Sequence, residues 1–275
     1  SSLVGSEMCI RDRRNLIYVT CMLIAMGACS ATSKNQAEVV TDTWGKYNVG
    51  TILFEDKAPE TKGSDVYHRI IPDAESYIKA QAREVLATLY NSPDDSIPTV
   101  NKIHYTLEDI EGVSAKGGGN GDVTIFYSTR HIEKSFAKND TAKLFFETRG
   151  VLLHELTHAY QLEPQGIGSY GTNRVFWAFI EGMADAVRVA NGGFDGPNAR
   201  PKGGNYMDGY RTAGYFFVWL RDNKDPEFLR KFNRSTLEVV PWSFDGAIKH
   251  ILGNEYNIDE LWHEYQVAVG DVQAQ

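Results

Sequence analysis

The segment GVLLHELTHAYQ, residues 150–161, constrains the fold of this chain more than any other stretch. His154 and His158 are four residues apart, so a helix places both side chains on one face. Glu155 follows the first histidine directly and can reach a water molecule on an ion held by that pair. The apolar residues Val151–Leu153 give the helix a buried face and turn the histidines toward a cleft. The segment predicts a zinc site with a general base; the alternative is an ordinary helix with two surface histidines.

A catalytic zinc ion needs a third protein ligand, which the residues just after this motif do not supply. The metzincin pattern requires a glycine and a histidine where this chain has Gln161 and Pro164. Further along, Glu181 and Asp185 are again four residues apart and share one face of a second helix. This Glu-x-x-x-Asp spacing is that of gluzincins, in which the glutamate binds zinc and the aspartate accepts a hydrogen bond from a ligand histidine.

Two alternatives to this arrangement remain open from the sequence. Asp185 could be the third ligand, with Glu181 in support. Both carboxylates could instead be solvated or pair with Arg174 or Arg188. Gly182, between them, would let the two site helices approach closely because it has no side chain.

Cysteine usage and charge exclude several other classes of protein. The three cysteines all lie within the first 29 residues, so the domain that follows has neither a disulfide nor a thiolate ligand. Any metal must therefore be held by His, Asp or Glu. The net charge is -8 without a basic stripe, which argues against nucleic acid or an anionic membrane surface as a partner. We expect a monomer whose acidity serves solubility.

Residues 1–29 are predicted to be a leader and not part of the fold. Three arginines precede the short apolar run 16–29, which ends in small residues, as is typical of secretory signal peptides. Met26–Cys29 resembles a bacterial lipobox, so we expect an exported lipoprotein at the cell envelope, held at the membrane only through a lipid on Cys29. The alternative is ordinary cleavage and a free secreted protein. The first dozen residues resemble adaptor-derived read-through.

The hydrophobic pattern from residue 44 to residue 275 indicates one domain, joined to the leader by a polar tether over 30–43. Strands come first and helices later, which favours an α+β fold over a parallel α/β sheet. We expect Gly117–Gly121 to form a flexible turn at the cleft rim and residues 123–128 to be an edge strand beside the cleft. The other expected strands cover residues 49–54 and 103–107. The expected helices cover residues 72–90, 140–161 (capped by Asn139 or Asp140, and either continuous or bent at Gly150), 176–189, 208–221, 226–232, 244–252 and 258–269.

Three stretches together resemble the plant basic secretory proteins and their bacterial relatives: GVLLHELTHAYQ, FIEGMADAVRVANGGF and DGYRTAGYFFVWL. The likeness extends over most of residues 45–270. That family is placed among the HExxH metallopeptidases of the gluzincin kind. The resemblance implies a zincin-like α+β fold with zinc between two helices. It implies His154, His158 and Glu181 as ligands and Glu155 as the catalytic base, and Asp185 matches the position that orients a ligand histidine. Unlike its namesakes, this chain is acidic, which puts an anionic target in doubt but not the zinc chemistry.

The expected function is hydrolysis of peptide bonds by zinc-activated water, with Glu155 passing the proton to the leaving amine. An oxyanion donor is also needed. Tyr210 is the first candidate and Tyr215 the second, with core packing as the alternative role of both. The alternative function is a non-catalytic binding protein that uses zinc as a clasp, and de-esterification of a glycan is a weaker option. A clasp closes all four positions and does not need Glu155, which argues for catalysis. Substrate specificity is expected in the loops 163–173 and 192–206.

Overall fold

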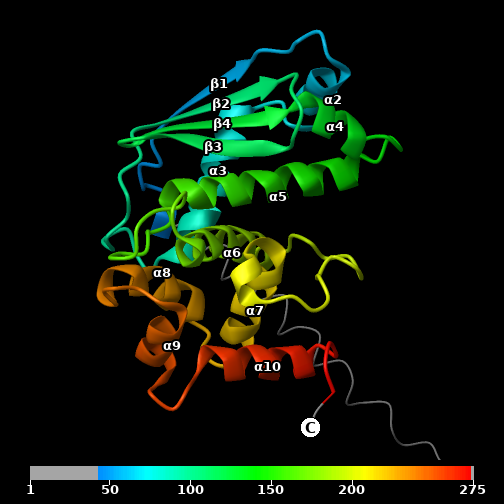
Figure 1. Cartoon of the computed structure of the whole chain (residues 1–275). Coiled ribbons are helices and arrows are strands. Elements are labelled where there is room, and N and C mark those ends of the chain that lie inside the picture. The colour runs from blue at the N-terminus through cyan, green and yellow to red at the C-terminus, as the bar shows by residue number, and fades with distance from the viewer. Residues whose placement is uncertain (1–42, 274–275) are drawn as a thin grey trace, which may run out of the picture. The chain divides into compact units, whose positions relative to one another are not determined.

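The computed structural model describes residues 43–273, in which a four-stranded mixed sheet is followed by a largely helical part (Figure 1). The strands are β1 (Thr51–Asp56), β2 (Lys102–Glu108), β3 (Ser114–Gly119) and β4 (Asp122–Ser128), in the sheet order β1-β2-β4-β3. β1, β2 and β4 are parallel, whereas β3 is antiparallel to β4 and forms an edge of the sheet. This arrangement confirms the predicted α+β fold class. The leader predicted for residues 1–29 and nearly all of the predicted tether lie outside the described residues.

Two predictions about this sheet are wrong, and a run of glycines is the reason for both. Residues 123–128 lie in β4, which is an interior strand because β3 pairs with its outer side. Gly117–Gly119 belong to β3 and are not part of a flexible turn. A run without side chains has low strand propensity and no alternation, so the sequence conceals this strand. The turn is confined to Asn120 and Gly121, whose φ values of 53° and 83° are those of an Asn-Gly hairpin.

The helices next to the sheet are α2 (Lys62–Ile70), α3 (Ala74–Leu89), α4 (Thr129–Ser135) and α5 (Thr141–Tyr160). The helix predicted over 72–90 is confirmed as α3, and the apolar residues that recur along it at helical spacing are buried: Ile78, Ala82, Val85, Leu86 and Leu89. α5 is one continuous helix, and Asp140 caps it by accepting a hydrogen bond from the Lys143 amide. Gly150 does not bend α5. A Cβ at Gly150 would lie 2.4 Å from Arg188 Nε, so the glycine makes room for that guanidinium group.

α5 lies between the sheet and the remaining helices (Figure 1). These are α6 (Arg174–Ala190), α7 (Tyr210–Asn223), α8 (Phe228–Glu238), α9 (Phe244–Leu252) and α10 (Ile258–Ala268). Each lies within a few residues of a predicted helix, except that α8 extends further. Buried aromatic side chains pack between them: Phe179, Phe217, Phe232 and Trp242.

Gly182 allows a close approach of α6 to α7, and not the predicted approach of α6 to α5. A Cβ on Gly182 would lie 2.7 Å from Ala213 Cβ and 2.7 Å from Phe217 Cε2, both on α7. The prediction that Gly182 lets the two site helices approach is therefore wrong, because its open side faces α7 and not α5. Its effect is to bring α7 against the helix that carries Glu181.

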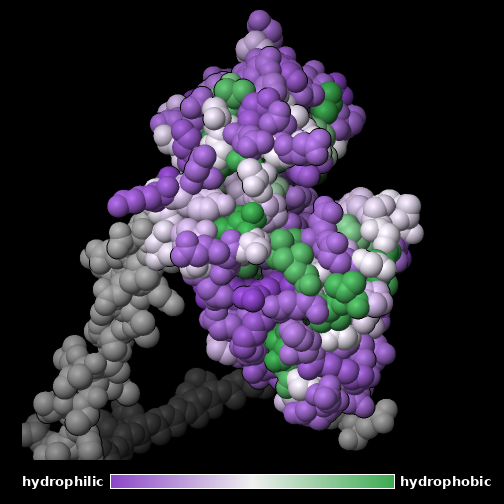
Figure 2. Space-filling model, turned by 90° about the vertical axis from the view of Figure 1, so that its left-hand side faces the viewer, coloured by the Kyte–Doolittle hydropathy of each residue, from purple (hydrophilic) through white to green (hydrophobic). Residues whose placement is uncertain are grey.

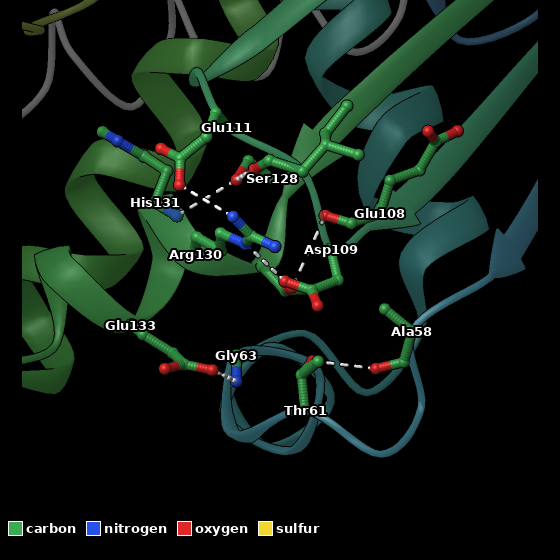
Figure 3. A network of polar contacts seen from close by, with 12 residues as sticks. Ala58, Thr61, Gly63, Glu108, Asp109, Glu111, Ser128, Arg130, His131 and Glu133 are labelled. Atoms are coloured by element: carbon green, nitrogen blue, oxygen red, sulfur yellow. Dashed lines mark hydrogen bonds and ion pairs between the residues drawn. The ribbon is translucent and has the colours of Figure 1, made fainter.

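A polar network at the carboxyl ends of β2 and β4 anchors the connection that leads into β3 (Figure 3). Arg130 on α4 donates hydrogen bonds to Asp109 and Glu111, each at 2.7 Å. Ser128, the N-cap residue of α4, donates its hydroxyl to the carbonyl of Ile110 at 2.6 Å. Exposed ion pairs contribute little singly, but two on one guanidinium group define its position. The network thus sets where the edge strand begins.

The apolar side chains of the described part are concentrated in one core that runs from Trp44 to Tyr265. Figure 2, viewed from the left-hand side of Figure 1, shows a largely hydrophilic surface on which apolar side chains form limited patches. None of the helices within residues 43–273 combines the length and the apolar character needed to cross a membrane.

Candidate active site

α5 and α6 lie side by side in opposite directions and bring the predicted metal ligands together. The two histidines come from the last turns of α5, and Glu181 comes from the middle of α6. The Nε2 atoms of His154 and His158 are 3.1 Å apart, and Glu181 Oε2 lies 3.3 Å from the first and 3.7 Å from the second. Ligands about 2.0–2.1 Å from a tetrahedral zinc ion are about 3.3 Å from one another. The three side chains therefore have a spacing at which they could hold a metal ion.

The carboxylate of Glu181 fits such an ion particularly well. Glu181 is 4% exposed, and its Oε2 has no hydrogen-bond partner among the described residues. A buried carboxylate oxygen without a partner is costly unless a cation meets it. Burial alone would raise the pKa of Glu181, but the nearby imidazoles of His154 and His158 keep it below its ordinary value. The group is therefore charged and directed at two imidazole nitrogens.

Asp185 lies one turn further along α6 and meets the opposite side of the His154 ring. Its Oδ1 accepts a hydrogen bond from His154 Nδ1 at 2.7 Å. This bond holds a proton on Nδ1 and turns Nε2 toward Glu181. Because Asp185 sits on the Nδ1 side of the ring, the geometry favours Glu181 over Asp185 as a third ligand.

The arginines considered as alternative partners are engaged elsewhere. Arg188 donates to Glu147 at 2.7 Å, and the guanidinium group of Arg174 packs on the Trp177 ring at 3.8 Å from its centre. Within residues 43–273 neither arginine forms an ion pair with Glu181 or Asp185. The two carboxylates therefore face histidines and not arginines.

The buried carboxylates make this site attract positive charge. Burial alone would lower the pKa of His154, but Asp185 and Glu181 raise it to about 10. Burial and the charge on His154 together lower the pKa of His158 to about 3. Without a metal ion, His154 thus carries a second proton and a positive charge, and a zinc ion would displace that proton because it binds neutral imidazole.

Glu155 lies beside the two histidines in the wall of a cleft of about 580 Å³. Glu155 is only 6% exposed, and burial is the main reason why its pKa is raised above that of an ordinary carboxyl group. A carboxylate with a raised pKa suits a base that accepts a proton and then returns it. Residues 113–116, at the start of the edge strand β3, line the same cleft.

The two tyrosines considered as oxyanion donors have different positions. Tyr210 lines the cleft, and its ring stacks on the His154 ring with the centres 6.1 Å apart. Its φ of 41° is unusual for a residue with a side chain, and the Trp177 ring supports it from the side at 5.4 Å. Tyr215 is instead occupied in donating its hydroxyl to the carbonyl of Phe194 and does not line the cleft.

Two residues that were not predicted to belong to the site also contact it. The hydroxyl of Tyr170 donates to Glu181 Oε1 at 2.6 Å, while the other oxygen of that carboxylate faces the histidines. The amide of Gln161 lies 2.8 Å from His158 Nδ1. Tyr170 belongs to the loop predicted to govern specificity, but no spacing rule relates a loop residue to a helix. Gln161 follows the motif three residues after His158, which places it near that ring and is a signal the sequence did contain.

Comparisons with known proteins agree with this picture at the level of the family. The model of a family described as "Peptidase of plants and bacteria" matches residues 50–265. No curated protein matches the chain. A solved structure from Bacteroides caccae ATCC 43185, described as a "putative zinc-binding metallo-peptidase", is 11% identical. The alignment covers 88% of this chain and 95% of that one, with a TM-score of 0.20, which is too low to carry an argument. The family match spans most of the chain, including both site helices, and the chain belongs to this family of peptidases of plants and bacteria.

Proposed function

We propose that the protein is a zinc-dependent metallopeptidase that hydrolyses peptide bonds. One observation carries the proposal: the buried Oε2 of Glu181 has no hydrogen-bond partner within the described residues and faces two imidazole nitrogens at tetrahedral spacing. A zinc ion held by His154, His158 and Glu181 would polarise the scissile carbonyl and activate a water molecule. Membership of a peptidase family supports a peptide as the substrate.

Glu155 moves the proton in this reaction. Its carboxylate accepts a proton from the attacking water and delivers it to the nitrogen of the departing amine, so that the group ends in its starting state. A positioned general base of this kind accelerates a reaction about 10²- to 10⁴-fold. Tyr210, which lines the same cleft as residues 113–116, donates its hydroxyl hydrogen to the carbonyl oxygen as negative charge develops there.

The substrate backbone pairs with the edge strand. The outer edge of β3 has backbone N–H and C=O groups that no strand of the described part pairs with, and residues 113–116 border the cleft. An extended peptide can add to such an edge through main-chain hydrogen bonds. Gly117–Gly119 have no side chains to obstruct a second strand. Pairing with an extended substrate, first predicted for residues 123–128, is therefore proposed for β3.

A non-catalytic binding protein on the same scaffold is the second candidate. A zinc clasp would not need a carboxylate beside its ligands, whereas Glu155 is buried there and its pKa is raised. Catalysis is therefore favoured. From the leader pattern alone, we propose that the protein is exported and anchored through Cys29.

The test compares the wild type with Glu155→Gln and with Glu163→Gln, which removes an exposed carboxylate from the same cleft. Zinc content is measured for each protein, and cleavage is followed on a library of internally quenched peptides. All three should bind zinc, and only Glu155→Gln should lose cleavage. If the wild type holds zinc and cleaves nothing in the library, the binding-protein alternative gains. Equal cleavage by the wild type and Glu155→Gln would contradict the proposed mechanism.

A further inference from the structure

Gln161 occupies a position that both its own backbone and its neighbours hold in place. It is the C-cap residue of α5, and its amide N–H donates to the carbonyl of Thr157 at 2.8 Å. The carbonyl of Tyr160 accepts the Tyr90 hydroxyl at 2.5 Å. On the other side, the amide of Leu162 donates to the side chain of a buried asparagine, Asn233, at 2.9 Å. The Gln161 side chain, 5% exposed, therefore starts from a fixed point beside the metal ligands.

The side chain of Gln161 meets the one nitrogen of His158 that does not face the other ligands. His158 Nε2 points to His154 Nε2 and Glu181, whereas Nδ1 lies 2.8 Å from the Gln161 amide. An imidazole that binds a metal through Nε2 carries its proton on Nδ1, and that N–H needs an acceptor. For His154 the acceptor is Asp185. For His158, the only hydrogen-bond partner of Nδ1 within the described part is Gln161.

Only one end of the amide can serve this N–H. The oxygen of an amide accepts and its NH₂ group donates, and the two ends have nearly the same shape. Gln161 Oε1 is buried and has no partner among the described residues, while Nε2 is the atom beside the imidazole. Two N–H groups facing each other would leave both donors unsatisfied, which is costly in a buried site. A ligand role for His158 thus requires the amide to present its oxygen.

We propose that Gln161 is a positioning residue for the metal site, whose carbonyl oxygen accepts the Nδ1–H of His158 and holds Nε2 toward the ion. The inference rests on the proposed zinc site. Each ligand histidine then has its own acceptor, an aspartate for His154 and a glutamine for His158. A neutral acceptor at the second position is consistent with the acidic groups already present, since Glu155, Glu181 and Asp185 are all buried around the two histidines. A fourth carboxylate is not needed for the orientation, because acceptance of the N–H is what matters.

The test uses two substitutions of Gln161 that keep the length of its side chain: Gln161→Met removes the strong acceptor, and Gln161→Glu keeps an acceptor oxygen while adding a carboxylate charge. Methionine keeps the length of the side chain but is at best a weak acceptor, whereas glutamate keeps an oxygen at the same place. Gln165→Met is the matched control, because Gln165 is an exposed glutamine four residues further on whose amide bonds only a backbone carbonyl. Zinc affinity is measured by competition with a chromophoric chelator, and thermal unfolding is followed in excess chelator. Peptidase activity is measured at saturating zinc.

Gln161→Met should bind zinc about 10- to 100-fold more weakly than the wild type, whereas Gln161→Glu and Gln165→Met should bind it about as tightly. In excess chelator the melting temperature of Gln161→Met should stay close to that of the wild type, and saturating zinc should restore most of its activity. Unchanged affinity in Gln161→Met would overturn the inference, as would an equal loss in Gln161→Glu. If the wild type itself bound no zinc, the metal site and with it this role would be wrong.

Discussion

Replacing Gly182 with alanine should destabilise the protein, although the same change inside an ordinary helix stabilises it by about 1 kcal/mol. The added Cβ would lie 2.7 Å from Ala213 Cβ, against about 3.5–4.0 Å for carbon atoms in contact. Ala213 Cβ cannot rotate away, so α6 and α7 must separate by roughly 1 Å. Overpacking of this kind costs about 1–3 kcal/mol, and the rigid neighbour places it near the upper end. After the gain in helix propensity, we expect a net loss of about 2 kcal/mol.

Thermal unfolding followed by circular dichroism, in excess chelator, measures this effect. For a domain of this size, 2 kcal/mol corresponds to a fall in Tm of about 4–8 °C. The control is Gly196→Ala, which adds a Cβ with no heavy atom within 4 Å and should change Tm little. Zinc affinity should also fall in Gly182→Ala, because α6 carries Glu181. If the Tm of Gly182→Ala were equal to or above that of the wild type, α6 and α7 would not be closely packed at this point, and the reasoning would be refuted.

Four other perturbations separate the roles of residues in and near the site. Asp185→Asn should weaken zinc binding about 10- to 100-fold, measured by chelator competition, because the amide accepts the imidazole N–H less strongly than a carboxylate. Tyr210→Phe should lower kcat about 10²- to 10³-fold at unchanged zinc content. Tyr170→Phe, which loses the hydrogen bond to Glu181, should instead weaken zinc binding. If Tyr210→Phe weakened zinc binding and Tyr170→Phe lowered only kcat, Tyr170 would be the oxyanion donor and Tyr210 the residue that supports the metal site. Burial alone would raise the pKa of Glu147, but the histidine and arginine beside it hold that pKa below its ordinary value. The stability that Glu147 contributes is thus present above its unfolded-state pKa and lost as the pH falls through the lower folded-state pKa. The Tm difference between the wild type and Glu147→Gln should therefore be largest near neutral pH and disappear in acid.

The parts of the site that follow helical periodicity could be predicted from the sequence. His154 and His158 share one face of α5, and Glu181 and Asp185 share one face of α6, as their four-residue spacing indicated. Apolar spacing likewise located α3 and most of the later helices. Residue spacing does not predict that α5 packs against α6. That contact was expected because the motifs resemble those of a known family.

What the sequence did not reveal depends on contacts between residues that no local pattern relates. β3 was missed because its glycines lack the side chains on which strand patterns depend, although Asn120-Gly121 was a hairpin signal. Tyr170 reaches the site from an irregular loop, where neither a period of 3.6 nor one of 2 applies. The open side of Gly182 could not be assigned to a helix, because a glycine has no side chain whose polarity would indicate its neighbour.

α5 belongs to both parts of the fold. In its first half, the hydroxyl of Thr148 bonds that of Tyr127 in β4 at 3.2 Å, and in its second half His154 meets Asp185 of α6. Because α5 is one continuous helix, its separation from one of these neighbours would also strain its contacts with the other. The sheet and the metal site should therefore open together, so that zinc at 1,000 times its Kd would protect both by about 4 kcal/mol. The backbone amides of β2 do not contact the proposed metal ligands. They should nevertheless exchange hydrogen more slowly when zinc is bound than when it is absent, because α5 connects the sheet to the metal site.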